Sequence, residues 1–386
     1  SLAVSLAVLC GSACSSPETS DSVPPPETPR SPIDSAGVLI FVTDGATASS
    51  PVGWQLDSVP ELVLGTSSHP DHQFFGVHGL RPLPEGGVLV VDAISRELRF
   101  FDPTGRVVHR AGRKGEGPGE YDKPYLVHTI DTTSLLLWDG GLKRFQLVSE
   151  RGEDPKVIRL AERWKGGGRP PLGAVGSMMF ARFPETAYPV RFGKVGVRTE
   201  RVDFNWIQPS TGEEIQVASF GVKTSYVTGH TSSGVPTVSG IPFAPRPSGT
   251  VSADAALVAE GFGPEVKEYD LDGRLRRIFR VDLPGRLVTD EMIEADIRRE
   301  VQVSLDFGIT DFTREIAEMS REGVPVSDTL PAFSSLQTDE IGWLWAEVFP
   351  WDHEAPKEWM VFDPEGYAPG VVETPAGLEV MRIGED

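Results

Sequence analysis

The chain has 386 residues, of which 39% are hydrophobic, so it can bury a sizeable core in one or two domains. Its 56 acidic and 36 basic residues give a formal net charge of −20, which repels a phosphate backbone and argues against nucleic acid as a partner. The 41 glycines and 33 prolines are scattered along the chain and favour many short β-elements over long helices.

Residues 1–14 resemble the export signal of a bacterial lipoprotein, truncated at its start. Residues 1–9 form an apolar run that is too short for a permanent membrane span, and small residues then lead to Cys14. We expect Cys14 to be lipidated; the alternative is an ordinary secretory leader. Because Cys10 and Cys14 are the two cysteines of the chain, the folded part can form neither a disulfide nor a cysteine-ligated metal site.

Residues 15–50 are predicted to be a Ser/Pro-rich tether and lead-in to a β-propeller domain at 51–386. Both interpretations of the leader place this domain outside the cytoplasm. We therefore expect an exported protein of the bacterial cell envelope that touches the membrane only through its lipid anchor.

A strand that ends in a Gly turn recurs five times. The spacing of the first copies is close to the roughly 40 to 50 residues of a four-stranded propeller blade. An apolar strand precedes each turn and is predicted to be the inner strand of its blade, because a strand that is apolar on both faces must be covered on both sides. These strands cover residues 87–92, 134–139, 177–182, 256–260 and 342–347. The pattern predicts an all-β, six-bladed propeller with four-stranded antiparallel blades.

Three segments depart from the repeat. Residues 164–172 and 224–249 are rich in Gly, Pro, Ser and Thr, and both are predicted to be loops. Residues 287–323 have helical period, with Thr289 as an N-cap. They predict an inserted helical pair, whose second helix starts near residue 310 and buries Phe312, Ile316 and Met319. It would cover a channel mouth or the side of a blade.

The sixth blade is expected to be incomplete. Residues 377–384 resemble the beginning of a blade just before the chain stops, so we suspect truncation at this end too. An early strand between residues 54 and 65 is predicted to add an outer strand to the same blade.

The loop Gly112–Tyr121, followed by Pro124, resembles the Gly-x-Gly-Pro-Gly-Glu-Phe-x-x-Pro opening of NHL-type β-propeller repeats. The next stretch, TSLLLWDGGLKRFQLV, resembles the inner and middle strands of that repeat, and residues 330–333 also fit. From Trp54 to Asp386 the chain is similar to the bacterial six-bladed β-propeller lipoproteins, most of which have no assigned activity. The resemblance implies a propeller and names no reaction.

The residues that end the predicted inner strands are the candidates for chemistry. If the repeats align, they lie at equal depth around the central channel: Asp92, Asp139, Arg182, Glu260 and Glu347. Their four carboxylates, Asp92, Asp139, Glu260 and Glu347, could hold a hard cation such as Ca²⁺. Alternatively, they pair with Arg99, Arg144, Lys267 and Lys357 or cap backbone groups. No other cofactor is expected.

Two further clusters are weaker candidates. His69, Asp71 and His72, with His78 nearby, could form a metal corner. The aromatic loop at residues 349–356 could meet a ligand. The chain contains neither a Gly-x-Ser-x-Gly elbow nor a His-Glu-x-x-His helix.

The sequence therefore favours an exported, lipid-anchored propeller that binds a small molecule or an envelope protein, or serves as a scaffold there. The alternative is a metal-dependent hydrolase or lyase with its site at the mouth of the central channel.

Overall fold

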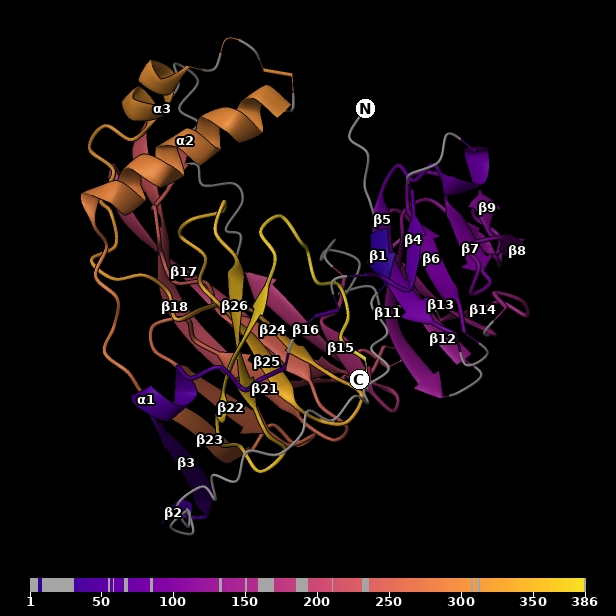
Figure 1. Cartoon of the computed structure of the whole chain (residues 1–386), viewed down its shortest axis with the longest axis horizontal. Helices are drawn as coiled ribbons and strands as arrows, with labels where there is room; N and C mark the ends of the chain where they lie inside the picture. The colour runs from indigo at the N-terminus through magenta and orange to yellow at the C-terminus, as the bar shows by residue number, and fades with distance from the viewer. Residues whose placement is uncertain are drawn as a thin grey trace.

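The computed structural model describes residues 6–8, 31–54, 56–57, 59–65, 69–83, 86–131, 134–149, 151–158, 170–184, 194–209, 211–230, 236–306, 308–309, 311 and 313–384. These residues build five sheets of four to six strands, which we call blades 1 to 5, and two small two-stranded sheets. The described part of the chain is therefore mostly β (Figure 1).

Blades 1 and 2 are four-stranded antiparallel sheets whose strands follow chain order, as predicted. Blade 1 comprises β5 (Val77–Pro82), β6 (Val88–Asp92), β7 (Glu97–Phe101) and β8 (Val107–Ala111). Blade 2 comprises β11 (Pro124–Asp131), β12 (Ser134–Asp139), β13 (Arg144–Ser149) and β14 (Lys156–Ile158). The Gly-rich loop between them contains β9 (Arg113–Lys114) and β10 (Glu120–Tyr121), which pair in parallel.

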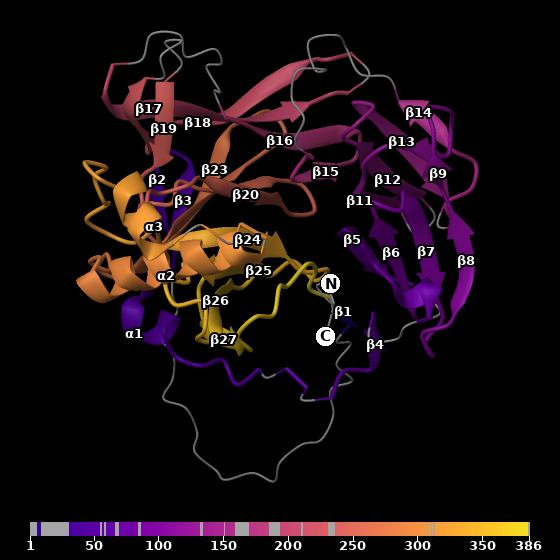
Figure 2. The same cartoon turned by 90° about the horizontal axis from the view of Figure 1, so that it is seen from above.

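The apolar strands of the repeat are the second strands of their blades, so their prediction as inner strands was wrong. The innermost strands are instead the first strands of the blades, β5, β11 and their counterparts, which contact one another around the centre (Figure 2). Every residue of β6 is buried, whereas β5 buries only Arg81. A second strand is covered on both faces by neighbouring blades and is apolar throughout, while an inner strand borders the centre and gives a weaker sequence signal.

Blade 3 has five strands: β15 (Gly173–Val175), β16 (Met178–Pro184), β17 (Gly196–Ile207), β18 (Glu214–His230) and β19 (Pro236–Gly240). The prediction of a loop at 224–249 was wrong over much of its length. Strand β18 continues to His230, and β19 pairs back against it with Ser225 opposite Gly240. Residues 225–228 and 236–239 are rich in Thr, Val and Tyr, which suit a strand even among glycines and serines. Most of the other predicted loop, 164–172, lies outside the described residues.

Blade 4 recruits the N-terminal part of the chain. Its own strands are β20 (Ser248–Val251), β21 (Ala256–Ala259), β22 (Glu265–Tyr269) and β23 (Leu275–Asp282). Strand β3 (Val38–Asp44) pairs in parallel with β23, and β2 (Ile33–Ser35) pairs with β3. Residues 33–44 thus belong to the folded part, although the sequence predicted a tether and lead-in up to residue 50.

The same segment joins blade 4 to blade 5. Phe41 packs edge-on against Tyr367, with ring centroids 5.2 Å apart, and the Thr43 hydroxyl accepts a hydrogen bond from the Ala368 N–H at 2.9 Å. Helix α1 (Gly45–Ala48) follows and buries Ala48 in the core shared by the two blades.

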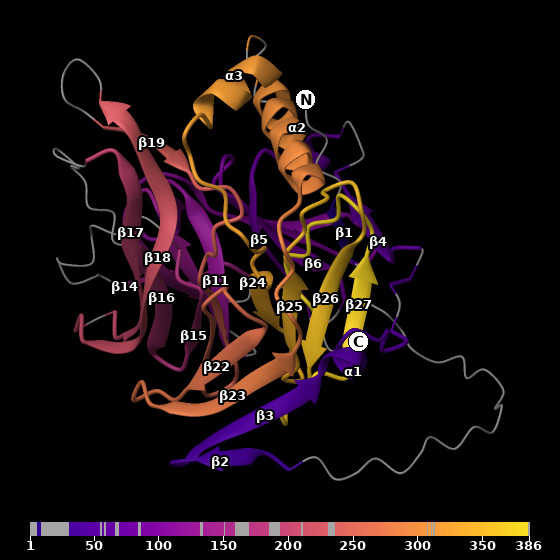
Figure 3. The same ribbon diagram turned by 90° about the vertical axis from the view of Figure 1, so that its left-hand side faces the viewer.

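Blade 5 consists of β24 (Phe333–Thr338), β25 (Leu344–Val348), β26 (Lys357–Phe362) and β27 (Gly370–Thr374). The predicted helical pair precedes it as α2 (Asp290–Asp306) and α3 (Arg314–Ser320), at the end of the molecule opposite β2 (Figure 3). The Thr289 hydroxyl accepts from the Met292 N–H at 3.4 Å, which confirms the predicted cap. The predicted packing of α3 was wrong. Ala317 is buried, Ile316 and Met319 are exposed, and Phe312 lies outside the described residues.

The five blades surround a common centre, with β5, β11, β15, β20 and β24 following one another around it (Figure 2). A sixth blade stays a prediction, because described residues 375–384 contain no strand. Strand β4 (Leu62–Leu64) pairs with β1 (Leu6–Val8), and Leu64 packs on blade 1 with Val88 and Phe101. Among the described residues, no helix is long and apolar enough to cross a membrane.

Candidate functional site

The second strand of each blade ends at one face of the ring, where the chain also enters the blade. We call this face, defined by the turns 92–97, 139–144, 260–265 and 348–357, the loop face. All the predicted carboxylates lie on or next to these turns.

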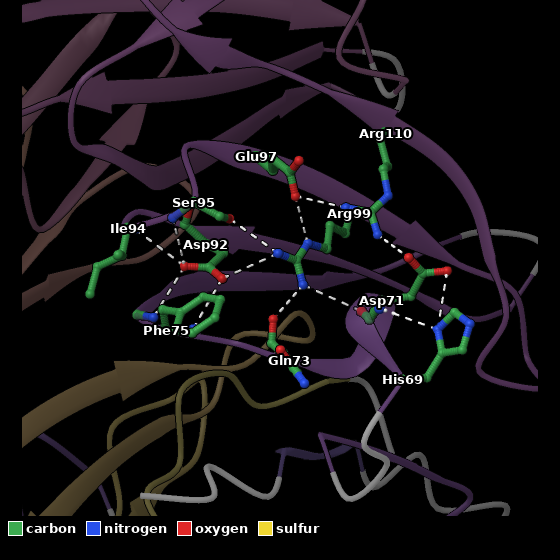
Figure 4. A network of polar contacts seen from close by, with 11 residues as sticks. His69, Asp71, Gln73, Phe75, Asp92, Ile94, Ser95, Glu97, Arg99 and Arg110 are labelled. Atoms are coloured by element: carbon green, nitrogen blue, oxygen red, sulfur yellow. Dashed lines mark hydrogen bonds and ion pairs between the residues drawn. The ribbon is translucent and has the colours of Figure 1, made fainter. Parts of the chain in front are cut away.

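Asp92 ends β6 at the loop face and is completely buried. Its Oδ2 accepts a hydrogen bond from the Phe75 N–H at 3.1 Å (Figure 4). Its Oδ1 accepts from the N–H groups of Gly76, Ile94 and Ser95 at 3.1, 3.2 and 3.4 Å. Two of these donors precede β5 and two belong to the following turn, so the carboxylate fastens both segments to the blade.

Arg99 completes the arrangement from β7, with a side chain only 4% exposed. Its guanidinium donates to the Gln73 carbonyl at 2.6 Å and to Glu97 at 2.9 Å, and lies 3.6 Å from the Asp92 carboxylate. Arg110 then bridges Glu97 and Asp71 (Figure 4). This network holds the segment that contains the 3₁₀ helix η1 (Pro70–His72) on blade 1.

Asp139 repeats the arrangement in blade 2. It accepts from the N–H groups of Asp122 and Lys123, both at 3.0 Å and 17 and 16 residues earlier in the chain. Phe75 and Gly76 precede Asp92 by the same intervals. Further bonds come from the turn, from Gly141 at 3.2 Å and Leu142 at 3.1 Å.

The Gly-rich loop of the sequence motif is held by the next strand of blade 2. Arg144 donates to the carbonyls of Gly117 and Glu120 at 2.8 and 2.9 Å, and Gln146 exchanges hydrogen bonds with Gly119 and Glu120. A buried carboxylate is tolerated when several N–H donors satisfy its oxygens. Asp92 and Asp139 each have four such donors, so both act as structural ties of the loop face.

Glu260 occupies the corresponding position in blade 4 but is more accessible. Its side chain is 37% exposed and pairs with Lys267 at 2.5 Å. Burial by itself lowers the pKa of Lys267, but the hydrogen bond and the charge of Glu260 outweigh this effect and raise it, so the ammonium stays charged. The pair lies in a depression of about 180 Å³ lined by Val258, Glu260, Phe262, Gly263, Glu265 and Lys267. The Phe262 ring at its edge is 56% exposed.

The predicted residues of blades 3 and 5 have other partners. Glu347 accepts from the hydroxyls of Ser334 and Ser335 at 2.5 and 3.0 Å and pairs with Lys357 at 3.2 Å. In blade 5, Val348 pairs with Phe333, the first residue of β24, just as Asp92 pairs with Val77, the first residue of β5. Val348 is therefore the counterpart of Asp92. Glu347 comes one residue earlier, so its side chain points to the opposite face of the sheet. Arg182 donates to the Pro247 carbonyl at 2.8 Å and ties blade 3 to the chain that enters blade 4.

The described residues bring together no group of three or more His, Cys, Asp or Glu side chains that could hold a metal ion. The four predicted carboxylates are therefore not gathered into one such group, and the Ca²⁺ site stays a prediction. The predicted histidine corner does not form such a group either. His69 caps η1 by accepting from the Asp71 N–H at 3.3 Å, and His72 packs on the Phe101 ring, with centroids 5.8 Å apart.

The aromatic loop at 349–356 lies beside the inserted helices. Burial and the charge of Arg299 in α2 lower the pKa of His353. Arg286, which precedes α2, donates to the Phe349 carbonyl at 3.0 Å, and Phe243 packs edge-on against the Phe349 ring at 6.3 Å. The loop is thus bound to the insertion and to the chain before β20.

Sequence reasoning missed the exposed apolar side chains of the loop face. Ile94 and Phe262 each follow the terminal carboxylate of a second strand by two residues, and they are 59% and 56% exposed. Phe75, next to Ile94, is 60% exposed. The signal was an apolar residue two positions after the carboxylate in each of these aligned turns. A single apolar residue in a turn, however, does not stand out beside the apolar strands around it.

No family model and no curated protein matches the chain. Among solved structures, a member of the DUF4221 family from Bacteroides vulgatus is similar at 11% identity and TM-score 0.41, over 78% of this chain and 83% of that one. Virginiamycin B lyase from Staphylococcus aureus is similar at 12% identity and TM-score 0.32, over 78% and 71%. Regucalcin, a calcium-binding protein from Agrobacterium tumefaciens, is similar at 8% identity and TM-score 0.29, over 77% and 76%. Similarity at this level identifies neither a family nor an activity.

Proposed function

We propose that this chain is an exported, lipid-anchored β-propeller that binds a small ligand on its loop face and catalyses no reaction there. The depression of blade 4 carries the proposal. It combines an accessible aromatic ring, Phe262, with the ion pair of Glu260 and Lys267. An apolar surface with a few fixed polar groups is the usual composition of a ligand site.

The rigidity of the loop face supports the same function. Asp92 and Asp139 fix the turns through eight backbone hydrogen bonds, four to each carboxylate. Loops held on a rigid scaffold are common binding surfaces, because the ligand does not have to order them. The proposal that the protein is exported rests on the signal-like residues before Cys14. Binding to an envelope protein is also a proposal.

The alternative, a metal-dependent hydrolase or lyase at the channel mouth, finds less support. Such an enzyme needs several oxygen or nitrogen ligands around one cation. The oxygens of the predicted carboxylates instead accept hydrogen bonds from backbone N–H groups and serine hydroxyls and form ion pairs with basic side chains of the protein.

The test is a thermal denaturation panel with glucose, phenylalanine, 4-phenylbutylamine and 4-phenylbutyrate. A ligand that binds only the folded state raises the melting temperature. We expect at least one compound to stabilise the protein and Phe262→Ala to weaken its affinity about fivefold or more, because the ring is lost from the depression. Val108→Ala is the matched control, since Val108 is equally exposed but lies on β8. If no compound stabilises the protein, or if both variants behave like the wild type, the depression is not the site.

A further inference from the structure

The junction between blades 1 and 2 lies at the loop face, where strands β5 and β11 begin. Strands β5 and β11 approach closely there because of Gly79. A Cβ atom on Gly79 would lie 2.5 Å from the Leu126 Cβ, and its φ of 142° also favours glycine. Just before these two residues, His78 and Tyr125 stack with ring centroids 4.1 Å apart and planes 14° apart.

Two exposed apolar side chains lie at the loop-face end of blade 1, beside Gly76, which comes two residues before His78. Phe75 and Ile94 are 60% and 59% exposed, and both backbone N–H groups are bonded to Asp92 (Figure 4). The side chain of Ile94 also lies over Gly76, where a Cβ would be only 3.0 Å away. The protein thus holds two apolar side chains in solvent on a fixed backbone, at the end of the blade where β5, the strand of His78, begins.

Lys123 supplies a positive charge at the same junction. Its N–H is held by Asp139, and its ammonium lies 5.7 Å from the centroid of the Tyr125 ring. Among the described residues, no carboxylate lies within ion-pair distance of this ammonium, whereas the neighbouring Arg96 pairs with Asp122 at 3.2 Å. Lys123 is therefore a cation with no carboxylate partner among the described residues, on a chain of net charge −20.

His78 adds no second charge. Burial and the positive charge of Lys123 lower its pKa, and these effects outweigh the nearby Asp92 and a hydrogen bond to the Pro124 backbone. The imidazole of the stack is therefore neutral near pH 7, and the positive charge beside the stack comes from Lys123.

We propose that this junction binds a small organic carboxylate with a flat apolar body. The carboxylate pairs with Lys123, and the body packs on Phe75, Ile94 and the stacked rings. A phosphate group would call for several cations or a helix N-terminus, which the described part of the junction does not offer. The inference rests on the proposed function only in taking the loop face as a ligand-binding surface, and its site is separate from the depression of blade 4.

The experiment compares three probes with one body: 4-phenylbutyrate, 4-phenylbutanol and 4-phenylbutylamine. Their affinities for the folded protein are measured by isothermal titration calorimetry at low ionic strength. We expect 4-phenylbutyrate to bind about fivefold or more tightly than 4-phenylbutanol, and the amine to bind most weakly, because a partly exposed ion pair contributes about 1 kcal/mol.

Variants locate the charge and the surface. Lys123→Met should abolish the preference for the anion, and Lys123→Arg should keep it. Lys114→Met is the matched control, because it changes the net charge equally from an exposed position of the Gly-rich loop. Ile94→Ala should weaken all three probes by a similar factor.

Three results would overturn the inference. The first is equal binding of the three probes or tighter binding of the amine, and the second is an anion preference that survives Lys123→Met. The third is binding that survives Lys123→Met but is lost in Phe262→Ala, which would place the ligand in the depression and leave the proposed function intact. If no probe binds in the calorimetry or stabilises the protein in the denaturation panel, both the proposed function and this inference are wrong.

Discussion

At the scale of single residues, the candidate carboxylates differ in the groups that donate hydrogen bonds to them. Asp92 and Asp139 are fully buried, and backbone N–H groups surround them. Glu260 has the same place in its blade, where Lys267 is its close partner among the described residues, and its side chain is 37% exposed. One position of the repeat thus serves structure in two blades and stays accessible to solvent in a third.

His78 makes the stability of the junction sensitive to pH. Its pKa in the folded state lies below the usual value of 6.5, because of burial and Lys123, so the unfolded chain takes up the proton first as the pH falls. The stabilising contribution of neutral His78 is therefore present above about pH 6.5 and is lost as the pH drops towards the folded-state pKa. We expect the urea midpoint to fall between pH 7 and pH 5 and to fall less in His78→Gln. Identical pH profiles for the two proteins would contradict this.

Some of the side-chain contacts could be predicted from the sequence. The strand alignment suggested four ion pairs, and three of them are present: Asp92 with Arg99, Glu260 with Lys267 and Glu347 with Lys357. The fourth was wrong, because Arg144 donates to carbonyls of the Gly-rich loop and does not pair with Asp139. The roles of Arg144 and Gln146 could not be read, because these side chains bond to backbone carbonyls of a loop whose position depends on the whole blade.

At the scale of elements, the strands themselves could be predicted, because turns with glycine and apolar runs mark their ends. Their order within a blade could not, since the sequence shows how apolar a strand is but not which strand borders the centre. The place of β3 was also hidden. Its residues 38–42 are apolar enough for a strand, yet its partner β23 lies more than 230 residues further along the chain.

The N-terminal segment carries a prediction about the anchor. After β1 (Leu6–Val8), which pairs with β4, the next described residues start at 31 and lead into β2, on the outer edge of blade 4. Because β2 and β3 begin beyond residue 32, changing Cys14 should leave the blades intact. We expect Cys14→Ser in the precursor to move the protein from the membrane fraction to the soluble fraction of the envelope, since lipid chains supply the membrane affinity. Circular dichroism should not change. Unaltered membrane association of the variant would exclude Cys14 as the anchor.

At the scale of the whole molecule, five blades surround one centre, and the chain ties them together in two ways. Buried carboxylates and arginines fasten the connecting segments at the loop face, and β3 with α1 joins blades 4 and 5 from outside. A ring held in this way presents fixed turns on one face. Both proposed sites lie on that face, one on blade 4 and one between blades 1 and 2.

The central claim is that the buried carboxylates hold the loop face together and do not hold a metal. The most direct test measures the free energy of unfolding of the wild type and of Asp139→Asn, each with and without Ca²⁺. We predict a loss of about 2 to 4 kcal/mol for Asp139→Asn, because an amide cannot accept from the four N–H groups as the carboxylate does.

The predicted loss is the same with and without Ca²⁺, and Asp272→Asn, a change at an exposed ion pair, should behave like the wild type. The contradicting result is a wild-type protein that Ca²⁺ stabilises by mass action and an Asp139→Asn variant that it does not.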